Sequence, residues 1–174
     1  NEAVALLAQL NAPVIAQVHG VAAGAGLSLM LQADFVLAAE GTRFNLAYIN
    51  LGTSCDVGAS WALPRLVGLR NALEIALMGD TLTAPDALRL GLVNRVVPPT
   101  ECNGVAQTQA RKLAAKPLSA LIEAKRLVKK GQAPQVQAVM AEEGASFGRM
   151  LREPAAREAF GAFMAKRKPD FSNC

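Results

Sequence analysis

The chain has 174 residues, of which 52% are hydrophobic and 18% charged, enough for one compact domain with its own core and too few for two large ones. No apolar run reaches the roughly 20 residues of a membrane span, and the first residues lack the basic start and cleavage pattern of a secretory signal, so we expect a cytoplasmic protein without a membrane span. The net charge of +4 is uneven, because residues 1–100 carry −2 and residues 101–174 carry +6, which suits either an anionic partner or solvated helix faces.

The first third of the chain predicts an alternation of strands and helices. Pro13 forces the residue before it away from helical geometry and so ends the first helix. Short apolar runs predict strands, and a segment that is apolar nearly all round predicts a buried helix. In chain order we expect a helix over 2–10, a buried strand over 14–18, a glycine-rich turn (HGVAAGAG), a helix over 27–33, and strands at 34–39 and 42–44.

The rest of the chain is mainly helical. Thr83 can cap a helix that has Pro85 in its first turn. We expect helices over 57–68, 71–80 and 82–91, a last strand at 93–97, and a boundary at the two prolines that follow. Four further helices are expected within 101–168, with breaks at Lys116-Pro117, 131–134 and Glu153-Pro154. Two of their charge groups, Glu142 and Glu143 with Arg149 and Glu158 with Lys166, are interpreted as solvated faces.

Cysteine and histidine limit the possible chemistry. Cys55, Cys102 and Cys174 are odd in number and widely spaced, so neither a disulfide framework nor a metal site is predicted. His19 is the only histidine and directly follows an expected buried strand, so it is interpreted as a packed residue rather than a catalytic base. Cys55 could be a nucleophile only if a cation or a helix N-terminus activated it, and neither is evident.

Asp56 differs from most acids of the chain, which fall on helix faces or at the ends of elements. It lies in a loop of small and polar residues, GTSCDVG, directly before an apolar helix that should shield it from water. Shielding of this kind is typical of carboxylates that exchange protons with a substrate. We therefore consider Asp56 a candidate acid/base, with a helix N-cap as the alternative.

The glycine-rich turn is a second candidate site. Glycine lets the backbone approach a ligand closely, and the first N–H groups of the following helix point outward. The turn matches neither of the glycine motifs that bind nucleotide phosphates. Its N–H groups could instead hold a carbonyl oxygen that becomes an oxyanion, and tight packing of the helix on a sheet is the alternative.

These segments together resemble the crotonase superfamily of enoyl-CoA hydratases and isomerases across nearly the whole chain. The resemblance is carried by NAPVIAQVHGVAAGAGLSL, ADFVLAAEGTRF, LPRLVG, ALMGDTLTAPDALRLGLVNRVVP and FGAFMAKRKPDF. It implies an α/β fold with a crotonase-like core of spiral β-β-α turns over residues 1–99, incomplete at its N-terminus, and a C-terminal helical trimerisation region over 100–174.

In this family two backbone N–H groups hold the oxygen of an acyl-CoA thioester. The resemblance assigns one of them to Ala25, with Gly24 and Gly26 leaving room for the ligand. It implies no metal and no cofactor apart from the coenzyme A of the substrate. It also makes basic residues near the C-terminus candidates for binding the CoA phosphates, and these are Lys166, Arg167 and Lys168.

Two positions depart from the family pattern. The hydratases carry glutamates where this chain has Ser28 and Tyr48, and neither residue is a credible general base near neutral pH. The segment with Asp56 and Trp61 instead resembles family isomerases of ring epoxides and enoyl-CoA esters, and chlorobenzoyl-CoA dehalogenases. We therefore expect isomerisation with Asp56 as acid/base and Ser28, Tyr48 and Trp61 near the substrate. Hydration, or a CoA-ester hydrolase or dehalogenase with an aspartate nucleophile, are the alternatives.

Family subunits begin well before the position of Asn1, with strands that supply the second oxyanion donor. We therefore interpret the chain as part of a longer protein, with an inactive remnant that binds CoA or RNA as the alternative. The resemblance further implies a homo-oligomer, either a trimer or a dimer of trimers. The basic cluster that RNA binding would use is Lys125, Arg126, Lys129 and Lys130, but the cluster lacks interleaved aromatics, so we do not expect a nucleic-acid partner.

Overall fold

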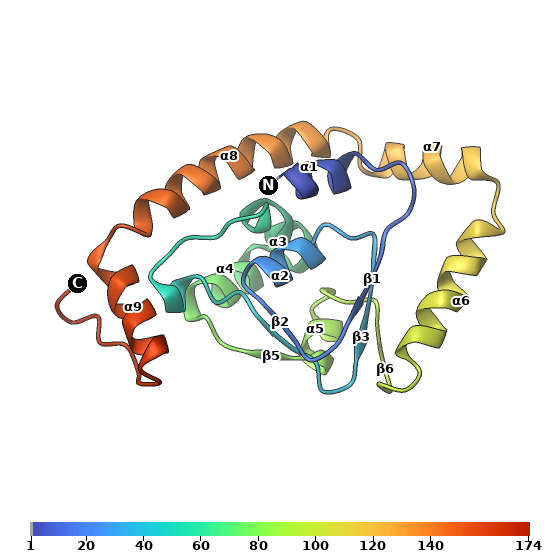
Figure 1. The fold of residues 1–174 in the computed structure, drawn as a ribbon. Helices are drawn as coiled ribbons and strands as arrows, with labels where there is room; N and C mark the ends of the chain where they lie inside the picture. The colour runs from blue at the N-terminus through green and yellow to red at the C-terminus, as the bar shows by residue number, and fades with distance from the viewer. Residues whose placement is uncertain (1) are drawn as a thin grey trace.

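Two small sheets form the centre of the computed structural model, which describes residues 2–174 (Figure 1). The first sheet has the strand order β1-β3-β6, with both pairs parallel. In the second, of order β2-β4-β5, β4 pairs in parallel with β2 and antiparallel with β5. The strands are β1 (Ile15–Val18), β2 (Val21–Ala23), β3 (Phe35–Ala39), β4 (Arg43–Asn45), β5 (Leu82–Thr83) and β6 (Arg95–Val97).

The chain winds as a spiral because the first four strands alternate between the two sheets. β1 and β2 lead into α2 (Ala25–Met30), and β3 and β4 then pair with β1 and β2 before the 3-10 helix η1 (Ile49–Leu51) and α3 (Ala59–Val67). Each β-β-α turn therefore lies on the one before it. The pairing of Ala23 with Asn45 sets the segment that follows β4 beside the glycine turn that follows β2.

The core lies between these turns. Its largest fully buried apolar side chains are Leu27 of α2, Phe44 of β4, Leu46 just after β4 and Leu63 of α3. The remaining helices of this part are α1 (Glu2–Gln9), α4 (Leu69–Met78) and α5 (Ala84–Arg89). Thr83 caps α5 as predicted, because its side chain accepts a hydrogen bond from the Asp86 N–H and its own N–H donates to the Asp86 carboxylate.

The last four helices run around the core as an arc, from α6 through α7 and α8 to α9 (Figure 1). They are α6 (Cys102–Ala114), α7 (Leu118–Val128), α8 (Gln132–Met150) and α9 (Pro154–Met164), so all three predicted breaks are confirmed. α8 contacts α1 and α3, and α9 contacts η1. The expected boundary near residue 100 falls between β6 and α6, while Asn1 lies outside the described residues, and trimerisation through 100–174 stays a prediction.

Gly52 shows how closely α9 lies against the core. It ends η1 with φ 65°, in the left-handed region, and a Cβ atom built on it would lie 2.7 Å from the backbone carbon of Ala155. A contact that close has no room for any side chain. The glycine is therefore required both by its backbone conformation and by the helix packed on it.

The structure corrects four details of the sequence interpretation. The glycine-rich turn contains a short strand, β2, and β5 precedes α5. β1 is only half-buried because it is the edge strand of its sheet. His19, which follows β1, is exposed, so its interpretation as a packed residue was wrong. Within residues 2–174, we find no helix with the length and apolar character that crossing a membrane requires.

Candidate active site

Asp56 lies in the loop between η1 and α3, in a half-buried position. Its Oδ1 accepts a hydrogen bond of 2.7 Å from the N–H of the next residue, Val57. Val57 has φ 64° and Gly58 has φ 78°, so two consecutive residues are left-handed. A β-branched residue rarely adopts that conformation, and such strain costs on the order of 1–3 kcal/mol and clusters at functional sites. The backbone that carries Asp56 is therefore held in place by contacts from elsewhere.

The glycine turn lies at the start of α2. Gly24 is the N-cap residue, with φ 51° and ψ −123°, a conformation that glycine adopts far more readily than other residues. Its N–H donates to the Asn45 carbonyl, and among the described residues no side chain caps the helix. Ala25, the first residue of α2, is exposed, as is Gly26. The backbone at this helix start is thus fixed to β4 and open to a ligand.

Ser28 and Tyr48 join these two segments. Their hydroxyl oxygens lie 3.0 Å apart, and both residues are buried. Each hydroxyl has one proton, so when Ser28 donates to Tyr48, Tyr48 donates to the Asp56 carbonyl at 3.4 Å, and the Gly24 carbonyl, 3.2 Å from the Ser28 Oγ, is the competing acceptor for the Ser28 proton. A chain of two hydrogen bonds therefore links Ser28, in α2, with the Asp56 loop. The sequence nominated all four residues but did not reveal that they touch one another.

The Tyr48 hydroxyl serves this site as a neutral group. Burial raises the pKa of Tyr48 to about 12; the hydrogen bond with Ser28 opposes the rise, and the nearby charge of Asp56 adds to it. The phenol is therefore protonated at neutral pH and can donate. Among these linked residues, Asp56 is the one that carries a carboxylate.

Glu143, on α8, is buried against the same loop. One of its carboxylate oxygens accepts from the Gly58 N–H at 2.6 Å, and the other accepts from the Ser60 N–H at 2.8 Å and the Ser60 hydroxyl at 2.5 Å. Its assignment to a solvated face was wrong, because α8 packs across α3. The signal was present in the spacing, since residue 143 falls on the stripe of Val136, Met140 and Phe147.

A cavity of about 520 Å³ opens between the loop, α3 and α8. Trp61 lines it, with the indole N–H donating to Gln135 at 3.2 Å and the Arg65 guanidinium 4.2 Å above the ring. Cys55 also lines it, and burial followed by the charge of Glu143 raises the pKa of its thiol to about 11. A thiol held neutral in this way is a poor nucleophile at neutral pH, as the sequence interpretation held.

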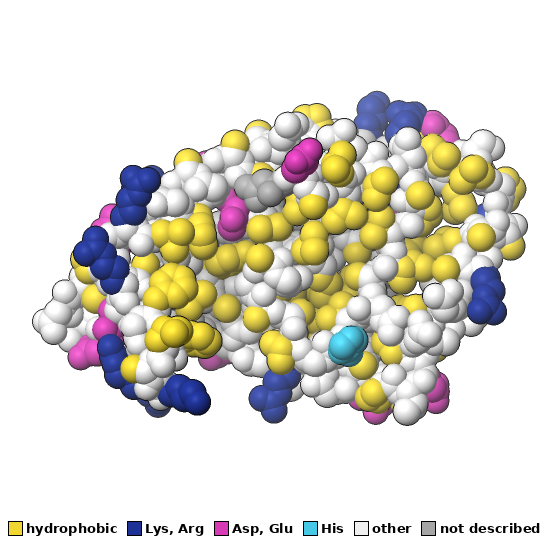
Figure 2. All heavy atoms as spheres, in the orientation of Figure 1, with side chains coloured by type: hydrophobic (Ala, Val, Ile, Leu, Met, Phe, Trp, Pro, Cys, Tyr) yellow, Lys and Arg dark blue, Asp and Glu magenta, His cyan; other side chains and the backbone are white. Residues whose placement is uncertain are grey.

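The surface beside the glycine turn is apolar. Figure 2 shows hydrophobic side chains gathered over the middle of this face, where Figure 1 places α2 and β2. The exposed members of these elements include Val21 and Leu29.

The C-terminal basic residues differ from one another in their surroundings. Arg167 forms a two-point ion pair with Glu158, at 2.5 and 2.8 Å. Lys166, which was interpreted together with Glu158 as a solvated face, is exposed and has a left-handed backbone. Lys168 is exposed. A role for these residues in binding CoA phosphates stays a prediction, and for Arg167 such binding would compete with Glu158.

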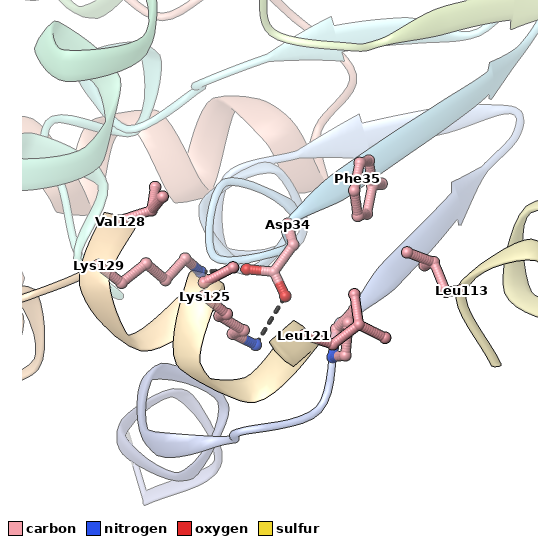
Figure 3. Close-up of a pocket in the computed structure, with 9 residues that line it drawn as sticks. Asp34, Phe35, Leu113, Leu121, Lys125, Val128 and Lys129 are labelled. Carbon is pink, nitrogen blue, oxygen red and sulfur yellow. Dashed lines mark ion pairs between the residues drawn. The ribbon is translucent and has the colours of Figure 1, made fainter. Parts of the chain in front are cut away.

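The basic cluster considered for RNA is largely occupied by ion pairs (Figure 3). Lys125 of α7 and Lys129, which directly follows that helix, point to the two oxygens of Asp34, at 2.6 and 2.5 Å, beside a cavity of about 310 Å³. Arg126 pairs with Glu123. Three of these four residues therefore have carboxylate partners within the chain, because the two lysines pack against the start of β3. Within residues 2–174, no group of three or more acidic, cysteine or histidine side chains could hold a metal ion.

Comparison with known proteins identifies the family. The family model of enoyl-CoA hydratase/isomerase matches residues 1–173. The chain belongs to this family. A crystal structure of an enoyl-CoA hydratase from Mycobacterium avium subsp. paratuberculosis superposes with a TM-score of 0.93 at 32% identity, covering 99% of this chain and 70% of that one. The crotonase-like fold that the sequence predicted is thus confirmed.

Two relatives show that the chain is similar to both kinds of enzyme in the enoyl-CoA hydratase/isomerase family. It is 37% identical over 173 residues to the 1,2-epoxyphenylacetyl-CoA isomerase of Escherichia coli, covering 99% of this chain and 66% of the relative. It is 36% identical over 160 residues to a probable enoyl-CoA hydratase of Rhodobacter capsulatus, covering 92% and 62%. The chain thus spans just under two thirds of the length of these relatives, and both isomerases and hydratases are among them.

Proposed function

We propose that the complete protein is an acyl-CoA enzyme that isomerises its substrate by a proton shift. Asp56 removes a proton from the carbon next to the thioester carbonyl, and the charge moves onto the thioester oxygen. The Ala25 N–H donates a hydrogen bond to that oxygen and so stabilises the enolate. Asp56 then returns the proton two carbons further along, which moves the double bond into conjugation. One carboxylate is sufficient, because the same group takes and returns the proton.

The observation that carries this proposal is the hydrogen-bonded chain from Ser28 through Tyr48 to the Asp56 carbonyl. It links the start of α2 with the acid loop. It also places two hydroxyl groups, those of Ser28 and Tyr48, at the positions where family hydratases carry glutamates. An isomerase is among the relatives at 37% identity, as the proposal requires, although a hydratase is equally similar.

The test is a panel of acyl-CoA esters given to the complete protein and to its Asp56→Asn variant. We expect the complete protein to move a double bond from the third to the second position of an enoyl-CoA, and the variant to bind the ester without turning it over. Turnover by the variant at the unaltered rate would reject Asp56 as the base.

Hydration is a second candidate, since several relatives bear the name enoyl-CoA hydratase. It requires a group that activates water, and Ser28 and Tyr48 are neutral hydroxyls that hydrogen-bond to each other. We expect crotonyl-CoA to remain unhydrated. Rapid hydration would favour this reading and would show that another group activates the water.

A nucleophilic Asp56 is the third candidate, as in a hydrolase or dehalogenase acting on a CoA ester. Mass spectrometry of enzyme quenched during turnover separates this reaction from a proton shift. An adduct on the peptide that contains Asp56 would support the nucleophile, and a proton shift leaves that peptide unmodified.

We further propose that the complete protein works as a homo-oligomer, a trimer or a dimer of trimers, and needs no cofactor beyond the CoA of its substrate. An inactive protein that binds CoA or RNA is the remaining alternative. Of the cationic residues considered for RNA, Lys125, Arg126 and Lys129 form ion pairs within the chain. Filter binding of RNA at low and moderate salt, with these residues neutralised in a variant, decides that alternative.

A further inference from the structure

Glu143 has no part in the proposed proton shift, yet it is buried and accepts three hydrogen bonds. It is 6% exposed, and its partners lie 83 and 85 residues earlier in the chain. All three donors belong to Gly58 and Ser60, on either side of the residue that begins α3. The carboxylate therefore caps α3 from a different helix, in place of the local side chain that usually does so.

The position of these donors connects Glu143 with Asp56. Asp56 and the strained Val57 directly precede Gly58, and the N-cap of α3 is Gly58 itself, with no side chain of its own. The left-handed backbone at Val57 persists only if contacts with other segments of the protein hold it. The Gly58 N–H bond to Glu143 lies one residue further along and is among the shortest in the loop. A weak hydrogen bond of 3.5 Å from Gln32 to the Val57 carbonyl and the packing of Val57 against the hydrophobic core also hold this segment.

We infer that Glu143 is the positioning residue of the proposed reaction: from α8 it holds the loop in the conformation that places the Asp56 carboxylate. This inference rests on the proposed function and adds a residue to it. Glu143 accepts hydrogen bonds only from the protein and acts on the substrate only through Asp56. A carboxylate suits the task, because both of its oxygens accept and neither donates.

Glu143→Gln tests this with almost no change in shape. An amide has one acceptor oxygen, so its NH₂ group must face either the Gly58 N–H or the two Ser60 donors, and the loop shifts. Glu142→Gln is the matched control, since Glu142 is the neighbouring residue, is exposed, and undergoes the same chemical change. Ser60→Ala is a milder variant that removes one of the three hydrogen bonds to Glu143. It provides the test if Glu143→Gln does not fold.

The first measurement is kcat in the complete protein, counted per binding site, beside the Kd for butyryl-CoA, a saturated ester that binds without reacting. We expect Glu143→Gln to lower kcat on the order of 100-fold, because displacing a catalytic group by about 1 Å has that effect, with Kd within about twofold. Ser60→Ala should lower kcat less and in the same sense, and Glu142→Gln should match the unaltered protein. If Glu143 only stabilises the fold, the melting temperature falls while kcat per binding site stays unchanged, and the inference is overturned.

The second measurement does not depend on activity. Amide hydrogen exchange at Gly58 and Ser60 should become faster in Glu143→Gln and stay unchanged in Glu142→Gln. Unchanged exchange in Glu143→Gln would overturn the inference even if the protein is an isomerase. If the unaltered protein isomerises no acyl-CoA ester, the proposed function fails, and the exchange rates alone decide whether Glu143 fixes the loop.

Discussion

Asp34 and Asp56 are both half-buried aspartates, and their surroundings are opposite in kind. Asp34 accepts from the Val14 N–H and pairs with Lys125 and Lys129, so several groups compensate its charge. Asp56 accepts from the N–H of the next residue, on a strained backbone. The Asp34 carboxylate thus connects the start of β1, the start of β3 and the end of α7.

The difference shows how the same side chain becomes structural or chemical. Burial favours the neutral form of Asp34, but the hydrogen bonds from Lys125, Lys129 and Val14 outweigh it and hold its pKa below the ordinary value. A carboxylate bound so firmly does not exchange protons near neutral pH. Among the ion pairs of the described residues, none involves Asp56. Hydrogen bonds to Asp56 and to Glu143 instead fix the backbone of the loop that carries Asp56. Substitutions at the two aspartates should therefore affect different properties.

The largest effect is expected for Asp56→Asn on the proton shift. A general base contributes about 10²–10⁴-fold, so we expect kcat of the complete protein to fall about 10³-fold. The free energy of unfolding should change by less than about 0.5 kcal/mol, because the substitution removes no ion pair. Steady-state kinetics and urea denaturation measure the two quantities. If Asp56→Asn lowered the free energy of unfolding as much as we expect for Asp34→Asn, the contrast between the two aspartates would be contradicted.

Asp34→Asn should show the reverse pattern. Removing one partner of a buried ion pair typically costs 3–5 kcal/mol, and since Lys129 is partly exposed we expect a loss of about 2–4 kcal/mol in the free energy of unfolding. The activity of the molecules that remain folded should be unchanged. Urea denaturation and the rate per CoA-binding site check this, and a fall in kcat at full occupancy would contradict it.

Tyr48→Phe should have an intermediate effect, because it breaks the link between the two parts of the site. It removes the hydrogen bonds to Ser28 and to the Asp56 carbonyl, which together contribute about 1–2 kcal/mol to stability. We expect kcat to fall about tenfold with a small change in Kd for the ester, since the loop loses one contact and keeps Glu143. Tyr48→Phe combined with Glu143→Gln should lower kcat by less than the product of the single effects.

Acid pH provides the next contrast. The folded-state pKa of Asp34 lies below its ordinary 3.8, so its ion pairs contribute stability above about pH 4 that is lost as the pH falls through the lower folded-state value. Asp34→Asn should remove this part of the acid dependence. Thermal melts between about pH 5 and pH 2 on both proteins measure the difference, and parallel curves would show that the pairs contribute nothing.

The smallest effect is expected at the exposed Glu158–Arg167 pair. The hydrogen bonds from Arg167 and from the Asp170 N–H lower the pKa of Glu158 to about 2, so any stability from the pair is lost between about pH 4.5 and pH 2. Glu158→Gln frees Arg167, and if Arg167 binds CoA phosphates, the Kd for CoA should fall slightly. A higher Kd would indicate that the pair itself organises the binding surface.

Much of the fold followed from local sequence. Apolar periodicity, prolines and glycines predicted the helices from α3 to α9 and the strands β1, β3, β4 and β6, because these signals act over a few residues. β2 and β5 were missed. Both are short and lie beside turn signals, and they exist because β4 pairs with each of them.

The site shows the same division. The sequence alone singled out Asp56 by its loop and the glycine turn by its composition, and family resemblance added Ala25, Ser28 and Tyr48. The contact of Ser28 with Tyr48, the capping of α3 by Glu143 and the capture of two lysines by Asp34 were decided by tertiary structure. A local pattern determines which backbone conformation a segment adopts and which face is apolar. It does not determine which distant helix crosses that face, and a carboxylate's role depends on the donors that the crossing brings to it.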